Sequence, residues 1–258
     1  MTTSTSTRAQ EFRDQLASRV IVADGAMGTM LYSRGVFINR CFDELNLSAP
    51  DTVRQIHQEY AKAGAEILET NTFGATRQRL GAFGFAEKLQ AINQAGVRLA
   101  REAANGAYVA GAVGPLNLRI EPLGPTSFAE ARAAFREQID ALLEAGVDLL
   151  IFETFGNLDE LREAVMAGHD ASGGDVPIVA QVTIDDFGYL PGGTDTETFT
   201  REMNSWPVDA IGLNCSVGPK ATLETVERMM EYATKPLSAM PNAGLPIDRK
   251  STRLNSSH

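Results

Sequence analysis

The sequence predicts an α/β fold, specifically a (β/α)8 TIM barrel truncated after the seventh strand. Short apolar runs that end in Gly, Asn, Asp or Pro alternate with segments of helical spacing, which is typical of parallel strands covered by helices. Polar residues follow nearly every apolar run, whereas a doubly wound sheet, the competing architecture, gathers its ligand residues at one switch point. A barrel needs eight strands, and the sequence provides seven candidates.

The candidate strands and helices alternate along the chain. The strand candidates are 20–28, 65–75, 107–115, 147–156, 176–186, 209–219 and 236–244. Helical spacing is clearest at 49–65, 85–105, 128–146, 157–172 and 222–235. Two units share a pattern, because "AKAGAEILET" and "LEAGVDLLIFET" both run from a helix through Ala-Gly to a strand that ends in Glu-Thr. We therefore expect an N-terminal extension at 1–17 and an incomplete barrel domain at 18–247.

Composition and charge favour a small-molecule partner. The 258 residues carry a formal net charge of −10, and Lys and Arg form no long run, which argues against nucleic acid or an anionic membrane as partner. Two cysteines in a chain of this length do not suggest a disulfide framework. The N-terminal residues lack the apolar core of a signal peptide, and no apolar run is long enough for a spanning helix. We expect a cytoplasmic protein without nucleic-acid or membrane partners.

Six motifs at the ends of successive predicted strands carry a resemblance to a known family. They are "DGAMGTMLYSRG", "ETNTFGA", "GPLN", "FETF", "GLNCSVGP" and "PNAGLP", in this order. Together they resemble the homocysteine S-methyltransferase domain of methionine synthases and betaine–homocysteine methyltransferases, over roughly residues 18 to 246. The N-terminal stretch is most similar to bacterial bifunctional proteins that join this domain to a methylenetetrahydrofolate reductase.

The resemblance implies zinc-dependent transfer of a methyl group to the thiol of homocysteine, which gives methionine. A free thiol has a pKa of about 8.5, so its proton must be removed to form the nucleophilic thiolate. In this family a zinc ion held by three cysteine thiolates binds the substrate sulfur, and tetrahedral sulfur-rich coordination suits zinc. Cys215 matches the first of these cysteines, and Asn242 resembles a residue that can occupy the open zinc position. The other two form an adjacent Cys-Cys pair on the eighth strand, which this sequence lacks.

Residues at three other strand ends are candidates for holding the amino-acid part of the substrate. Asp24 and Glu153 end the first and fourth predicted strands, where carboxylates can receive an ammonium group, although helix caps or loop ion pairs are an alternative role. Gly25 permits close backbone approach, so nearby amides could bind the substrate carboxylate, or it forms an ordinary turn. Thr70 belongs to the repeated Glu-Thr pattern. We expect Asp24, Glu153 and Cys215 to converge at one end of the barrel.

The last eleven residues, 248–258, read as a translation of a sequencing-library adapter. We therefore expect native sequence to end at or just before Ile247, so that the missing eighth strand reflects a truncated gene model. A natural disordered terminus is the alternative. With two of three expected zinc cysteines missing, the 258-residue chain is expected to be inactive.

The sequence leaves the methyl donor open. A methyl-donor domain or a small-molecule donor would serve, including methyltetrahydrofolate through cobalamin, betaine or S-methylmethionine, and only the N-terminal stretch suggests a folate link. A lyase or aldolase on the same barrel is an alternative, but no predicted strand end carries a lysine for a Schiff base. A non-catalytic fragment or binding module is a third hypothesis, which zinc titration with and without homocysteine would separate from the enzyme.

Overall fold

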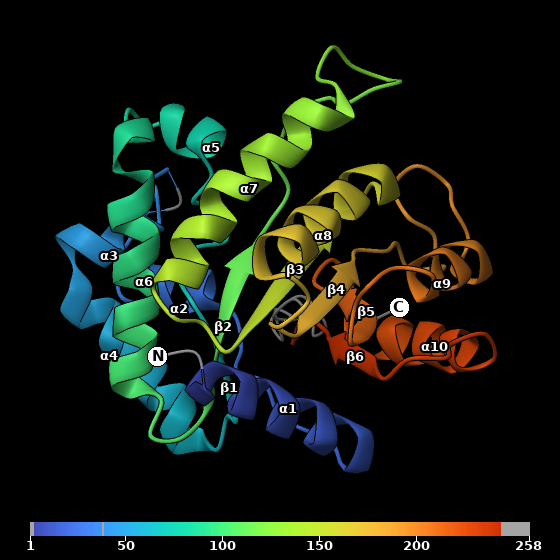
Figure 1. Cartoon of the computed structure of the whole chain (residues 1–258), viewed down its shortest axis with the longest axis horizontal. Coiled ribbons are helices and arrows are strands. Elements are labelled where there is room, and N and C mark those ends of the chain that lie inside the picture. Colours follow the sequence, from blue (N-terminus) through green and yellow to red (C-terminus); the bar gives the residue numbers. More distant parts are fainter. Residues whose placement is uncertain (1–2, 38, 244–258) are drawn as a thin grey trace, which may run out of the picture.

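Six parallel strands form one curved sheet in the computed structural model, which describes residues 3–37 and 39–243 (Figure 1). The strands are β1 (Ile67–Glu69), β2 (Tyr108–Val113), β3 (Leu149–Phe155), β4 (Ile178–Val182), β5 (Ala210–Asn214) and β6 (Leu237–Met240). Each strand lies beside its predecessor in the chain, so strand order equals chain order. A doubly wound sheet would reverse that order at a switch point. The curled half-barrel confirms the predicted α/β barrel architecture.

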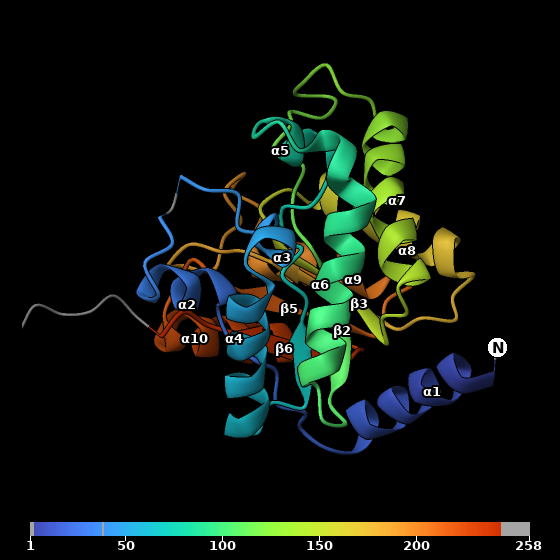
Figure 2. The ribbon, with the colours of Figure 1, turned by 90° about the vertical axis from the view of Figure 1, so that its left-hand side faces the viewer.

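Helices join successive strands and cover the outer face of the sheet. Those between strands are α5 (Arg77–Gly81), the short 3-10 helix η1 (Ala86–Lys88), α6 (Leu89–Ala103), α7 (Phe128–Glu144), α8 (Leu158–Ser172), α9 (Thr196–Asn204) and α10 (Pro219–Met230). Before β1 lie α1 (Thr3–Ser18), α2 (Met27–Ser33), α3 (Leu45–Ser48) and α4 (Pro50–Ala63). Figure 2 shows α4, α6 and α7 side by side on one flank. Sequence periodicity located α4, α6, α7, α8 and α10, but it missed α1, α9 and the short helices. Among the described residues, no helix combines the length and the apolar character needed to cross a membrane.

Local sequence signals begin and end several of these helices. At the start of α7, Ser127 and Glu130 form a capping box in which each side chain bonds to the other residue's backbone amide. At the start of α8, the side chain of Asn157 accepts a hydrogen bond from the amide of Glu160. The helix α4 ends at Gly64, whose φ of 102° suits a residue without a side chain. These signals set the residues at which α7 and α8 begin and at which α4 ends.

The first predicted strand, at 20–28, is present only as an isolated bridge. Ala23 pairs in parallel with Ile67, and the carbonyl of Val22 accepts hydrogen bonds from the amides of Glu66 and Ile67. The segment has a neighbour on one side only, and Val20 and Val22 are 85% and 53% exposed. The prediction of seven strands was therefore wrong in number, since the described residues form six strands and this bridge.

The alternation of side chains along each strand divides the core in two. In β3, Leu150 and Phe152 point outward and pack against the helices, in the largest apolar cluster of the described residues. Leu149 and Ile151 point the other way and fill the barrel interior. This interior cluster joins the amino-terminal parts of the strands, and it contains no residue of the helices that cover the outer face.

The helix α1 closes the amino end of this interior, below the strands in Figure 1. Phe12 is 1% exposed, packs among the first residues of the strands, and places its ring centroid 5.2 Å from that of Tyr108. Two arginines of α1 pair with acids that directly precede strands, Arg8 with Asp148 and Arg13 with Asp209. Arg19, which directly follows the helix, pairs in the same way with Glu66. The boundary predicted at residue 17 therefore falls at the end of a helix that packs into the barrel.

Candidate active site at the carboxyl ends of the strands

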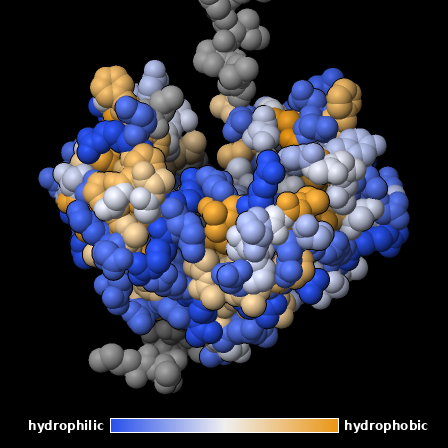
Figure 3. Space-filling model, turned by 90° about the horizontal axis from the view of Figure 1, so that it is seen from above, coloured by the Kyte–Doolittle hydropathy of each residue, from blue (hydrophilic) through white to orange (hydrophobic). Residues whose placement is uncertain are grey.

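The interior of the barrel becomes polar where the strands end. In β1, Ile67 packs in the interior and Glu69 follows it on the same side, and in β3 the same relation joins Ile151 to Glu153. Asn214 ends β5 at the corresponding level. Side chains from different strands at one level form a layer of a barrel, so these polar groups lie above an apolar floor. Seen from above the view of Figure 1, the molecule has two lobes with an indentation between them (Figure 3).

Three carboxyl groups from separate strand ends meet in this layer. Oδ2 of Asp24 accepts a hydrogen bond from the amide of Glu69 at 3.1 Å. Oδ1 of Asp24 and Oε1 of Glu69 are buried and have no hydrogen-bond partner among the described residues. Burial raises the pKa of both groups well above the usual range, and the charge of Glu153 raises each further. The three groups are therefore close enough to repel one another, and they retain protons that free carboxyl groups lose.

The surroundings of Glu153 shift the pKa of its carboxyl group in opposite directions. The pKa of its carboxyl group is raised to about 7, mainly by burial and in addition by the charge of Asp43, although the charge of Arg79 and a hydrogen bond from Asn214 act in the opposite direction. The guanidinium of Arg79 lies 4.6 Å from the ring centroid of Phe73. Sequence reasoning identified neither Arg79 nor Asp43, because one belongs to a five-residue helix and the other to a loop, and neither segment has a periodic pattern.

Cys215 directly follows β5 and lies beside the carboxyl groups. Its Sγ is 3.6 Å from Nδ2 of Asn214, and the same nitrogen is 3.1 Å from Oε2 of Glu153. Burial raises the pKa of the thiol, and the charge of Glu153 adds to this effect. The fold thus brings Asp24, Glu153 and Cys215 to the same end of the barrel.

Thr70 and Gly25 have clear local contacts. Oγ1 of Thr70 lies 2.6 Å from Oγ1 of Thr72 and accepts a hydrogen bond from the amide of Ala112 at 3.1 Å, so this hydroxyl ties the loop after β1 to β2. The backbone at Gly25 approaches Tyr60 closely, because a Cβ at this position would lie 3.0 Å from the phenolic oxygen. A side chain at Gly25 would therefore displace the ring of Tyr60. The substrate-binding roles of both residues stay predictions.

Asn242 lies on the loop after β6, next to the loop that carries Cys215. The amide of Asn242 donates to the carbonyl of Val217 at 3.0 Å, and the amide of Cys215 donates to the carbonyl of Met240 at 3.1 Å. These backbone bonds hold the two loops together, while the side chain of Asn242 is exposed.

The described residues do not provide a complete zinc site. Among them, no group of three or more His, Cys, Asp and Glu side chains is arranged to hold a metal ion. The other cysteine, Cys41, is buried in a separate apolar cluster, where burial raises the pKa of its thiol to about 11. A site of three thiolates therefore does not fit this set of residues.

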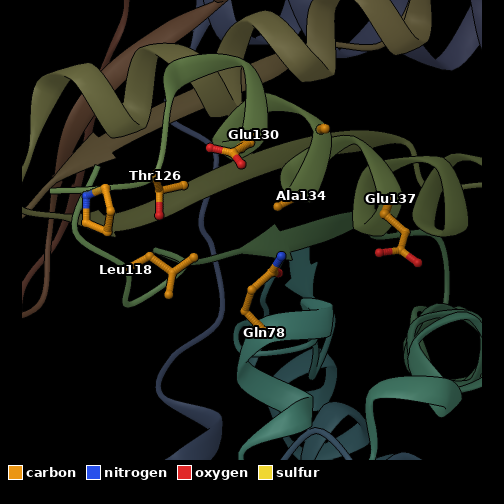
Figure 4. Close-up of a pocket in the computed structure, with 8 residues that line it drawn as sticks. Gln78, Leu118, Thr126, Glu130, Ala134 and Glu137 are labelled. Atoms are coloured by element: carbon orange, nitrogen blue, oxygen red, sulfur yellow. The ribbon is translucent and has the colours of Figure 1, made fainter. Parts of the chain in front are cut away.

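A groove of about 590 Å³ lies outside the candidate site, between α5, the β2–α7 loop and α7 (Figure 4). Its lining residues are Gln78, Leu118, Pro125, Thr126, Glu130, Ala133, Ala134 and Glu137. Both glutamates of this lining already have partners within the chain: Glu130 belongs to the capping box of α7, and Glu137 pairs with Arg77. None of the carboxyl groups beside Cys215 lines this groove.

The sequence matches known proteins over most of its length. The homocysteine S-methyltransferase family matches residues 21–257. Methionine synthase of Mycobacterium tuberculosis (strain ATCC 25618 / H37Rv) is 34% identical over 250 residues, which cover 91% of this chain and 21% of that protein. Methionine synthase of Mycobacterium leprae (strain TN) gives the same identity and coverage. The chain thus spans about a fifth of the length of these relatives.

Solved structures of a homocysteine methyltransferase superpose on most of this chain. The homocysteine methyltransferase MmuM from Escherichia coli, in its metallated form, superposes with a TM-score of 0.79 at 26% identity, over 92% of this chain and 88% of that one. Its apo form superposes with a TM-score of 0.72, also at 26% identity, over 90% and 86% of the two chains. Because the family match covers most of the sequence and the fold agrees with that of MmuM, the chain belongs to the homocysteine S-methyltransferase family.

Proposed function

We propose that this chain binds homocysteine at the carboxyl ends of its strands and serves in the transfer of a methyl group to the homocysteine sulfur, which yields methionine. The observation that carries the proposal is the proximity of three carboxyl groups and a cysteine thiol above an apolar barrel floor. Homocysteine offers an ammonium group, a carboxylate and a thiol. The methyl donor stays open, and a folate-linked donor is the one that the N-terminal stretch favours.

Asp24 and Glu153 are proposed to receive the ammonium group. Neither forms an ion pair among the described residues, and a bound cation would relieve their mutual repulsion. Glu69 would contribute to the same negative site. Backbone amides around Gly25 are proposed to bind the substrate carboxylate, and Thr70 to keep the loop after β1 in place. The thiol of homocysteine would then lie toward Cys215.

Affinity for homocysteine is expected to rise with pH up to about 7. A protonated Glu153 cannot pair with the ammonium group, and burial raises its pKa to about 7, so the ionised fraction grows as pH approaches that value. The dissociation constant, measured by NMR titration between about pH 5.5 and 7.5, should fall by up to about tenfold per pH unit on the acid side.

Two variants check this assignment. Glu153→Gln should bind homocysteine more weakly and with a flatter pH profile. Glu163→Gln changes a glutamate of α8 that is 3% exposed and paired with Arg132, outside the site, and should keep the parent profile. An unchanged slope in Glu153→Gln would assign the ionisation to a different group.

For zinc we propose that Cys215 supplies one thiolate ligand, with the exposed amide of Asn242 close by. One thiolate provides only part of the affinity of a structural zinc site, whose apparent binding free energy is about 10–16 kcal/mol. The 258-residue chain is therefore expected to retain much less than one zinc ion after dialysis, as measured by atomic emission. Cys41→Ala and Cys215→Ala should both show the same low content, and one zinc per chain in the parent would contradict the expectation.

A further inference from the structure

We propose that Asn214 is a positioning residue, whose carboxamide holds Glu153 and Thr154 in the orientation that the amino-acid substrate requires. This inference rests on the proposed homocysteine function. It adds a residue that acts through its neighbours and not by contact with the reacting sulfur.

The carboxamide of Asn214 reaches from β5 across the barrel interior to β3, which is not its neighbour in the sheet. Oδ1 accepts a hydrogen bond from the amide of Thr154 at 2.6 Å. Nδ2 donates to Oγ1 of Thr154 at 2.8 Å and to Oε2 of Glu153 at 3.1 Å. Asn214 is only 4% exposed, so water does not compete effectively for these bonds. One side chain thus fixes two consecutive residues of another strand.

The backbone held by Asn214 is strained. Thr154 has a φ of 64°, in the left-handed region that a β-branched residue strongly disfavours. The pairing of β3 with β4 shifts register between Phe152 and Phe155, so Glu153 and Thr154 lie in an irregular part of the strand. Irregularities of this kind redirect a side chain, and a strained backbone persists only where surrounding contacts hold it. The bonds from Asn214 to the amide and hydroxyl of Thr154 are contacts of this kind.

The same carboxamide also orients the carboxyl group. It bonds to Oε2 of Glu153, and Oε1 of Glu153 makes no hydrogen bond among the described residues, which leaves that oxygen for a ligand. Cys215 follows Asn214 in the chain, and its Sγ lies 3.6 Å from Nδ2. The distance between the carboxyl group and the thiol is therefore set at Asn214. A flexible substrate with an ammonium group at one end and a thiol at the other needs that distance to be fixed.

The test compares Asn214→Ala with Asn204→Ala. Asn204 also joins two segments, because its Nδ2 donates to the carbonyl of Tyr232 at 2.8 Å and its Oδ1 accepts from the amide of Thr234 at 3.1 Å. It bonds to no residue of the candidate site. Binding of L-homocysteine to the full chain is followed by NMR titration, with thermal unfolding measured on the same samples. We expect about tenfold weaker binding in Asn214→Ala, whereas Asn204→Ala should lower stability and keep the parent dissociation constant.

Hydrogen exchange at the Thr154 amide reports the positioning role without substrate. This amide should exchange faster in Asn214→Ala than in the parent or in Asn204→Ala. Adding Thr154→Gly, which tolerates the left-handed conformation, should recover part of the lost affinity. If Asn214→Ala does not fold, Asn214→Asp takes its place. It keeps the acceptor for the Thr154 amide and loses the bonds that Nδ2 donates, so binding should weaken while that amide stays protected.

The outcomes separate this inference from the proposed function. Parent-like affinity in Asn214→Ala, together with weakened binding in Glu153→Gln, would overturn the role of Asn214 and leave the homocysteine site intact. Absence of homocysteine binding in the parent chain would contradict the proposed function instead. In that case, parent-like protection of the Thr154 amide in Asn214→Ala would overturn the positioning role, and lost protection would support it.

Discussion

Replacing Phe12 with alanine is expected to lower the free energy of unfolding by about 3–5 kcal/mol. Phe12 is 1% exposed and fills the amino end of the barrel interior between Ile67, Tyr108 and Leu149. Each of these strands is paired with its neighbours, so the sheet cannot close around the smaller side chain and a cavity remains. Urea denaturation followed by circular dichroism measures the difference.

Phe187→Ala is the matched control for this prediction. Phe187 is 74% exposed on the loop between β4 and α9, so its truncation should change the free energy of unfolding by less than about 0.5 kcal/mol. A loss below about 1 kcal/mol in Phe12→Ala would mean that α1 contributes little to closing the barrel, contrary to its packing and its two arginine pairs.

The strands could be predicted because strands covered on both faces are continuous apolar runs between turn residues. The residues of β2, β4 and β5 are all buried, and the runs at 107–115, 176–186 and 209–219 contain them. The length of a strand depends on the neighbouring strands that pair with it. The run at 20–28 does not reveal that its segment has a pairing partner on one side only. The packing of α1 could not be predicted from the sequence either, because the helix is polar along most of its length and Phe12 is its main contact with the core.

The candidate site was predictable to the extent that it lies at strand ends. Asp24, Glu153 and Cys215 each follow an apolar run, and in a barrel such positions meet. The contacts that control them were not predictable. Asn214 belongs to the motif that contains Cys215, but its hydrogen bond to the Thr154 amide spans 60 positions of the chain, and only the folded sheet brings the two together.

Gly212→Ala is expected to separate β6 from β5 and to lower the free energy of unfolding by about 3 kcal/mol or more. Gly212 is paired with Ser238 in the parallel register, and a Cβ at Gly212 would lie 2.0 Å from the backbone oxygen of Ser238. A backbone atom cannot rotate away as the end of a side chain can, so the strands must move apart. The amide of Cys215 donates to the carbonyl of Met240 at the end of the same pair of strands. This hydrogen bond should be weakened together with the other hydrogen bonds between β5 and β6.

Gly192→Ala provides the control, because a Cβ at Gly192 would have no atom within 4 Å. Denaturation should leave the stability of Gly192→Ala within about 0.5 kcal/mol of the parent. Hydrogen exchange at the Cys215 amide should become faster in Gly212→Ala only. Since displacement of the Cys215 loop changes the distance from the thiol to Glu153, homocysteine affinity should fall in the same variant. Equal stability and equal amide exchange in the two glycine variants would show that β6 is not held against β5 at this point, and the cause proposed for the effect on the site would then be wrong.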